Sequence, residues 1–87
     1  MSLAVVYGQR DQNEPAIIEV LEKLGWLCTQ LSEPGVPDLL LWRRGEFRVA
    51  EVKSAKGRLT NAQTTFHAEH PGIPILRTLD DAVRYFR

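Results

Sequence analysis

The sequence predicts an α/β domain in which a small mixed β-sheet is flanked by helices. Three observations indicate this class: an apolar stripe at helical spacing near the N-terminus, short apolar runs that are typical of strands, and elements in the order helix, three strands, helix, strand, helix. With 87 residues and no internal repeat or linker, residues 1–87 are expected to form a single domain. A domain of this size buries only about 60–65% of its unfolded surface, so dimerisation would add to its stability.

The first helix is predicted over residues 12–24. Asp11 and Glu14 have the spacing of a capping box, and Pro15 in the first turn costs no internal hydrogen bond. Gly25 is typical of the position just after a helix. The apolar stripe of this helix consists of Ile17, Ile18, Val20, Leu21 and Leu24.

Three strands are predicted next, and a two-residue turn at Arg44 and Gly45 is expected to join the last two as a hairpin. The predicted strands cover residues 26–31, 38–43 and 47–53. Trp26 is expected in the core. Cys28 is the single cysteine and cannot form an internal disulfide, so we expect a buried structural thiol rather than a nucleophile.

The C-terminal half is predicted to alternate helices with one short strand. A second helix begins with a capping box at Thr60 and ends before Pro71, and a third helix capped at Thr78 runs to the C-terminal end. Residues 73–76 form the strand between them. Leu3–Tyr7 is a further candidate strand near the N-terminus.

The composition places the chain among ordinary globular proteins. Hydrophobic residues make up 44% and charged residues 25%, which excludes a disordered chain and a disulfide scaffold. The sequence contains no run of about 18 apolar residues, and Met1–Tyr7 lacks the basic start of a signal peptide. We therefore expect a cytoplasmic protein with no membrane partner.

The formal net charge is zero, but the basic residues are unevenly distributed. Six of the eleven fall in one segment, which permits a local positive surface, although a solvated hairpin tip explains the charge equally well. These residues are Arg43, Arg44, Arg48, Lys53, Lys56 and Arg58.

The predicted hairpin carries charged residues where a small core would favour apolar ones. A turn centred on Arg44 and Gly45 places Asp38 directly opposite Glu51, with their Cβ atoms about 4.5–5.5 Å apart on one face. Lys53 lies on the same face, because side chains alternate along a strand. Two carboxylates this close repel by roughly 1–4 kcal/mol. A divalent cation would offset that repulsion.

Mg²⁺ suits this arrangement because it prefers oxygen ligands and often takes only one or two protein carboxylates. Asp38, Glu51 and the backbone carbonyl of Val52 would supply one side of its coordination sphere. The ammonium group of Lys53 would orient a water nucleophile or stabilise charge on a scissile phosphate. We expect Mn²⁺ to substitute for Mg²⁺.

Three segments carry a resemblance to a nuclease family: GVPDL at 35–39, EVK at 51–53 and LTNAQ at 59–63. The Pro-Asp pair followed by Glu-Val-Lys resembles the PD-(D/E)XK nuclease superfamily. With the following Leu-Thr-x-x-Gln, the pattern is similar to the VRR-NUC (virus-type replication-repair nuclease) family. An acidic residue on the first helix, Glu14, extends the resemblance over nearly the whole chain and implies a restriction-endonuclease-like core.

The resemblance implies a Mg²⁺-dependent endodeoxyribonuclease in a bacterial or phage-infected cell. Asp38 and Glu51 would bind one or two metal ions, and Lys53 would position or activate the water. Glu14, as a metal ligand through water, and Gln63, in contact with metal-bound water, Lys53 or phosphate, would complete the site. For both Glu14 and Gln63, helix capping is the alternative explanation.

Lys56 and Arg58, with Arg43, Arg44 and Arg48 at the hairpin, would supply phosphate contacts. Such contacts carry no sequence information, so structure-selective cleavage is expected rather than a restriction specificity. Stand-alone members of the resembled family suggest a homodimer similar to Holliday junction resolvases, which would act on branched or four-way DNA.

Two other functions are compatible with the sequence. One is a catalytically inactive, nuclease-like DNA-binding module. The other is a structural dimerisation domain in which Glu51 and Lys53 form ion pairs. Trp42 and Phe47 are expected to be core or dimer contacts rather than platforms for bases. His67 is expected on the surface, with an approach to DNA as the alternative.

Overall fold

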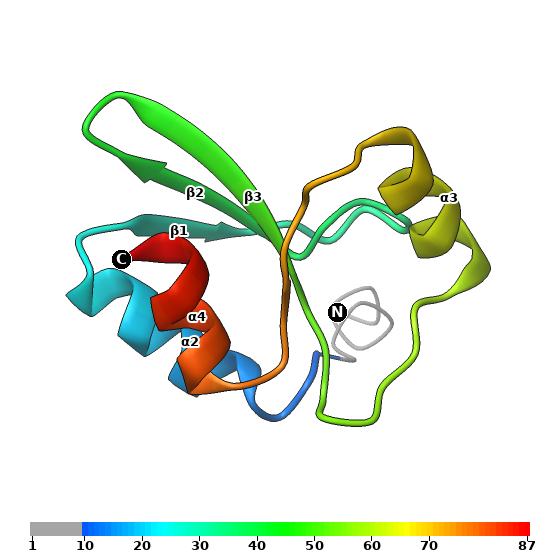
Figure 1. Ribbon diagram of the computed structural model, residues 1–87, viewed down its shortest axis with the longest axis horizontal. Helices are drawn as coiled ribbons and strands as arrows, with labels where there is room; N and C mark the ends of the chain where they lie inside the picture. The colour runs from blue at the N-terminus through cyan, green and yellow to red at the C-terminus, as the bar shows by residue number, and fades with distance from the viewer. Residues whose placement is uncertain (1–9) are drawn as a thin grey trace, which may run out of the picture.

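The computed structural model describes residues 10–87, so the candidate strand Leu3–Tyr7 lies outside the described residues. It confirms a compact α/β fold with a mixed sheet flanked by helices (Figure 1). No helix within the described range is long and apolar enough to cross a membrane. The elements are α2 (Glu14–Lys23), β1 (Leu27–Gln30), β2 (Leu39–Arg43), β3 (Glu46–Val52), α3 (Asn61–Glu69), β4 (Ile75–Leu76) and α4 (Leu79–Phe86).

The four strands form a mixed sheet in the order β1-β2-β3-β4. The first three are antiparallel, and β4 pairs with β3 in parallel. The hairpin has the register that a turn centred on Arg44 and Gly45 predicts. These two residues have φ of 51° and 82°, because a two-residue type I′ turn requires positive φ at both positions. Leu39 pairs with Ala50 at the open end of the hairpin, so the next two residues, Asp38 and Glu51, lie opposite each other.

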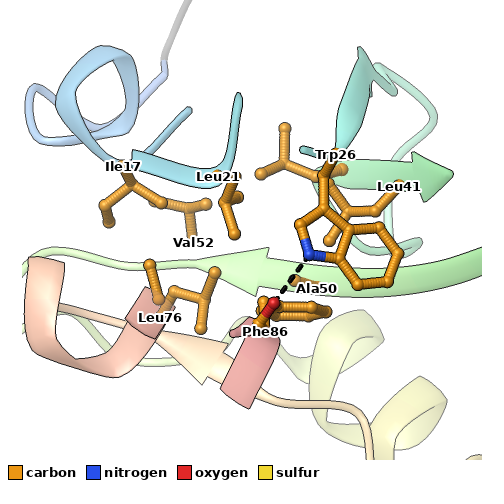
Figure 2. Packing of buried hydrophobic residues seen from close by; sticks show 10 residues of the cluster. Ile17, Leu21, Trp26, Leu41, Ala50, Val52, Leu76 and Phe86 are labelled. Atoms are coloured by element: carbon orange, nitrogen blue, oxygen red, sulfur yellow. Dashed lines mark hydrogen bonds between the residues drawn. The ribbon is translucent and has the colours of Figure 1, made fainter. Parts of the chain in front are cut away.

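One face of the sheet packs against α2 and α4, which contact each other (Figure 1). Trp26 closes this core: its Nε1 donates to the carbonyl oxygen of Phe86 at 2.7 Å, and the two rings meet edge to face (Figure 2). The prediction that Trp26 is a core residue is confirmed. The buried apolar residues are Ile17, Leu21, Trp26, Leu39, Leu41, Ala50, Val52, Leu76, Ala82 and Phe86.

The other face of the sheet is less covered. At the hairpin end, Leu27, Trp42 and Phe47 are neighbours across three strands and are 66%, 38% and 64% exposed. We call them the exposed apolar row. The prediction that Trp42 and Phe47 are core residues is therefore wrong, because these side chains are exposed on the face away from α2 and α4. Their contact with a second copy of the chain stays a prediction. Helix α3 stands apart from α2 and α4 and contains no buried residue (Figure 1).

The start of α2 differs from the sequence prediction. Helix α2 begins at Glu14 with Asn13 as its N-cap and has no side-chain cap, so the capping box of Asp11 with Glu14 is wrong. The Asn13 side chain instead donates to the carbonyl oxygens of Lys53 and Arg77, both at 3.0 Å. These long-range bonds attach the start of α2 to the ends of β3 and β4. The capping boxes of α3 and α4 are confirmed.

Cys28 lies in β1 and is half-buried. Burial, together with the charge of Glu22, raises the pKa of its thiol to about 11. Because the thiolate is the nucleophilic form, this shift agrees with a structural role.

Candidate metal centre

Asp38 and Glu51 lie together at the open end of the β2–β3 hairpin. Asp38 precedes β2, and its Oδ2 accepts a hydrogen bond from the backbone nitrogen of Val52 at 2.9 Å. Glu51 is only 1% exposed. Burial first, and then the neighbouring Asp38 carboxyl, raises the pKa of Glu51 to about 9. Burial and the neighbouring carboxyl thus disfavour the charged form of Glu51, and a bound cation would favour it.

Lys53 directly follows the end of β3, and its positive charge partly opposes the rise in the pKa of Glu51. Val52, between them, directs its backbone amide toward Asp38. Amide and carbonyl of one strand residue point to the same edge, so the carbonyl of Val52 also lies on the Asp38 side. The structure thus brings together the four residues of the predicted metal and water site.

Gln63 makes the capping contact that the sequence predicts, and it also makes a contact with Glu51 that was not predicted. Its Oε1 accepts from the backbone nitrogen of Thr60 at 2.9 Å, which is the capping bond. Its Nε2 donates to Glu51 Oε2 at 3.0 Å. The side chain therefore starts α3 and ties the helix to the carboxylate pair.

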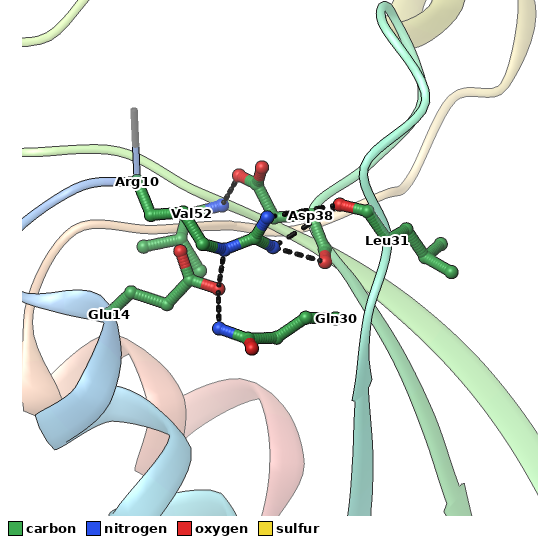
Figure 3. Close-up of polar contacts among 6 residues, drawn as sticks. All are labelled: Arg10, Glu14, Gln30, Leu31, Asp38 and Val52. Atoms are coloured by element: carbon green, nitrogen blue, oxygen red, sulfur yellow. Dashed lines mark hydrogen bonds and ion pairs between the residues drawn. The ribbon is translucent and has the colours of Figure 1, made fainter. Parts of the chain in front are cut away.

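Glu14 is buried and points inward, but it reaches the pair indirectly, through Arg10 (Figure 3). Its Oε2 accepts from Arg10 Nε and from Gln30 Nε2, each at 3.0 Å. The other guanidinium nitrogens of Arg10 donate to the carbonyl oxygens of Leu31 and Asp38, at 3.1–3.3 Å. Glu14 thus orients Arg10, and Arg10 fastens the backbone of Asp38. Sequence reasoning did not identify this contact, because Arg10 precedes the helix and the i,i+4 spacing of helical ion pairs does not apply to it.

The loop after β3 carries Lys56 and leads to Arg58, and both are exposed. Arg77 holds this loop from β4, because its Nη1 donates to the carbonyl oxygens of Ser54 and Gly57, both at 2.7 Å. The loop passes close to itself at Gly57, where an added Cβ would lie 2.8 Å from Ser54 Oγ and would require that side chain to move. Sequence reasoning did not identify Arg77, and an isolated arginine after a strand gives no signal of such a role.

The hairpin arginines do not join the carboxylate pair. Arg43 Nη1 donates to the carbonyl oxygen of Leu24 at 2.9 Å, and its guanidinium lies 4.2 Å from the centre of the Trp26 ring. Arg48 lies over the ring of Phe86 at 4.8 Å. Both therefore cover the helix-packed face, and Arg44 is exposed at the turn.

His67 is not the surface residue that the sequence suggested. It lies one turn after Gln63, its side chain is 14% exposed, and its Nε2 is 3.9 Å from Glu51 Oε1. Burial lowers the pKa of His67, which favours the neutral ring. Neither of these two buried atoms has a hydrogen-bond partner within residues 10–87.

The donor set fits a hydrated divalent cation rather than a fully protein-enclosed one. Among the described residues, no group of three His, Cys, Asp or Glu side chains is placed to hold a metal ion. Two carboxylates and a carbonyl would leave the remaining positions to water or substrate, which suits Mg²⁺. Glu51 Oε1 is buried and has no hydrogen-bond partner among residues 10–87, so a bound ion would compensate it.

Comparisons of this chain with protein-family models, with curated proteins and with solved structures find no match.

Proposed function

We propose that this protein is a Mg²⁺-dependent endodeoxyribonuclease with a restriction-endonuclease-like PD-(D/E)XK core of the VRR-NUC type. The observation that carries the proposal is the pair formed by buried Glu51 and half-buried Asp38, beside Lys53. The raised pKa of Glu51 means that its ionised form is destabilised beside Asp38. Groups with perturbed pKa values cluster at functional sites. A bound cation would stabilise the ionised form.

Each side chain of the centre has a separate task in hydrolysis of a phosphodiester. A divalent cation, when bound, would stabilise charge on the phosphate and lower the pKa of coordinated water. Asp38 is held by the Val52 amide, and Glu51 by Gln63, so both carboxylates are oriented in advance. Lys53 would hold the attacking water or neutralise charge on the reacting phosphate. Glu14 acts at a distance, by keeping Arg10 on the Asp38 backbone.

The DNA backbone would approach over the loop that carries Lys56 and Arg58. This loop directly follows Lys53 and is fastened by Arg77, so it presents exposed charge next to the carboxylate pair. Contacts of this kind bind phosphate without reading bases, which favours recognition of DNA shape.

Branched DNA, with a four-way junction as first choice, is the substrate we propose, cut by a homodimer with two symmetric sites. The exposed apolar row supports a second copy as partner, because contiguous apolar surface of this kind often marks an interface. Light scattering should then give about twice the 9.9 kDa chain mass. Phe47→Ser should shift the protein toward monomer, whereas Leu79→Ser, at an exposed position of α4, should not.

The decisive experiment tests metal-dependent cleavage in matched variants. Asp38→Asn and Glu51→Gln should each lower cleavage of a panel of duplex, flap, splayed and four-way DNAs by at least about a thousandfold. Each variant should fold at least as stably as the parent without metal, because one member of a repelling pair is removed. Asp80→Asn, at an exposed position of α4, is the control and should retain full activity.

Retained cleavage in the folded Asp38→Asn and Glu51→Gln proteins would refute the nuclease assignment. DNA binding without cleavage in the parent protein would instead favour an inactive DNA-binding module. A dimer that binds neither Mn²⁺ nor DNA would favour the structural alternative, which the exposed apolar row also supports.

A further inference from the structure

The two carboxylate oxygens of Glu51 are held differently. Oε2 accepts a hydrogen bond from Gln63 Nε2 at 3.0 Å, whereas Oε1 has no hydrogen-bond partner within the described part of the chain. The Glu51 side chain is only 1% exposed, so bulk water does not compensate Oε1. Buried polar atoms are normally hydrogen-bonded, and an exception at a proposed site calls for a functional explanation.

The nearest candidate partner of this oxygen is the imidazole of His67. Its Nε2 is also buried and without a hydrogen-bond partner among residues 10–87, and it lies 3.9 Å from Glu51 Oε1. Hydrogen bonds between nitrogen and oxygen span about 2.7–3.2 Å, so the 3.9 Å contact is open by roughly 1 Å. Hydrogen bonds of an active site are often long in the absence of substrate and shorten when the site is loaded.

We infer that His67 is a positioning residue, whose Nε2–H donates to Glu51 Oε1 when the centre is loaded, so that α3 holds both oxygens of this carboxylate. This inference rests on the proposed metal centre and assigns the residue that orients its buried carboxylate. His67 acts on Glu51 and not on the ion, because no group of three His, Cys, Asp or Glu side chains in the described range is placed to hold a metal.

Helix α3 is suited to this role. Gln63 and His67 are four residues apart, so they lie on one side of the helix. No residue of α3 belongs to the buried core, so core packing does not oppose a shift of the imidazole by about 1 Å. One donor leaves a carboxylate free to rotate about that bond, whereas two donors fix its plane. Partners that orient a metal-binding group typically change metal affinity by about 10–100-fold.

The two histidines of the chain are expected to carry their ring protons on different nitrogens. His70 Nδ1 lies 2.9 Å from the carbonyl oxygen of Phe66, which only accepts, so a neutral His70 carries its proton on Nδ1. A neutral His67 must carry its proton on Nε2 to donate to Glu51. Long-range ¹H–¹⁵N spectra of the parent protein with Mg²⁺, at about pH 8 where an ordinary imidazole is neutral, distinguish the two tautomers without any substitution. A proton on Nδ1 of His67 would overturn the inference.

Matched variants measure what the donor contributes. His67→Phe keeps a planar ring but removes the donor, and it should weaken Mg²⁺ binding in isothermal titration calorimetry by about tenfold or more. His67→Gln restores an N–H donor and should stay within about threefold of the parent. His70→Phe is the control and should leave the affinity unchanged, because His70 is exposed and bonds to Phe66 instead of Glu51.

The outcomes separate this inference from the proposed function. Parent-like Mg²⁺ affinity in His67→Phe, or equal weakening in His67→Phe and His67→Gln, would overturn the donor role of His67 and leave the nuclease centre intact. No Mg²⁺ binding by the parent, together with full activity of Glu51→Gln, would remove the metal centre itself.

Discussion

The two faces of the sheet are built from different interactions. On the face covered by α2 and α4, residues such as Leu21, Trp26 and Phe86 are at most 1% exposed. On the other face, α3 has no buried residue and contacts Glu51 through Gln63 and His67. Apolar packing is non-directional and supplies stability, whereas polar contacts position groups at a cost in desolvation. Stability and chemistry therefore lie on opposite faces of one small sheet.

The largest expected difference between the faces is in core packing. Leu21→Ala should lower the free energy of unfolding by about 2–5 kcal/mol, because it leaves a cavity beneath a fully covered sheet. Phe66→Ala on α3 removes a larger side chain from a partly exposed site and should cost less than about 1 kcal/mol. Urea denaturation of both variants measures the contrast. Equal losses would show that α3 belongs to the same cooperative core.

The carboxylate pair should give the α3 face a distinctive pH dependence in the absence of metal. The folded protein keeps a proton on Glu51 up to a pH of about 9, whereas the ordinary pKa is 4.5. The folded state thus binds one more proton between these values, and the free energy of unfolding falls as pH rises, by at most about 1.4 kcal/mol per pH unit.

Glu51→Gln should remove this decline. The measurement is the free energy of unfolding of parent and variant from pH 5 to pH 8, in the presence of a metal chelator. This pH range lies between the ordinary and the raised pKa of Glu51. Burial lowers the pKa of His67, so that residue contributes a trend of opposite sign, and the difference between the two proteins largely cancels it. Parallel pH profiles would mean that Glu51 is already charged without metal.

The sequence was sufficient to predict a mixed sheet flanked by helices and the register of the hairpin. Strand alternation and a turn at Arg44 and Gly45 determine the register, and that register places Asp38 opposite Glu51. The capping contact of Gln63 was predictable from its spacing to Thr60, whereas its bond to Glu51 was not predicted.

Other parts of the centre depend on contacts between segments distant in sequence. Arg10 donates hydrogen bonds to the backbone of Leu31 and Asp38, and Arg77 donates to the backbone of the loop at 54–57. No local sequence pattern predicts these partners. His67 was expected on the surface, whereas its side chain is only 14% exposed and faces Glu51. Helix α3 is held by polar contacts, which hydrophobic periodicity does not detect.

Substitution of Arg58 and of Arg43 tests which part of the protein surface binds the DNA backbone. Arg58→Ala should reduce the salt dependence of DNA affinity by about 0.9 in log–log slope, since one phosphate contact is lost. Arg43→Ala should leave that slope unchanged and lower stability instead, because Arg43 bonds to Leu24 and stacks on Trp26. Fluorescence anisotropy over a salt series measures the slopes. A reduced slope for Arg43→Ala would extend the DNA surface to the hairpin.

The smallest expected effect is on stability and distinguishes α3 from α4, which both begin with a capping box. Thr60 and Thr78 each form a capping box, the first on α3 and the second on α4. Loss of such a cap costs about 1 kcal/mol. Because α4 contributes Ala82 and Phe86 to the core, Thr78→Ala should lower global stability by that amount. Because α3 contributes no residue to the buried core, Thr60→Ala should leave global stability within about 0.3 kcal/mol and accelerate amide hydrogen exchange only in α3. It should also weaken Mn²⁺ binding, since Gln63 and His67 approach Glu51 from that helix. A global loss equal to that of Thr78→Ala would show that α3 unfolds only with the core, and the division of labour between the two faces would then be wrong.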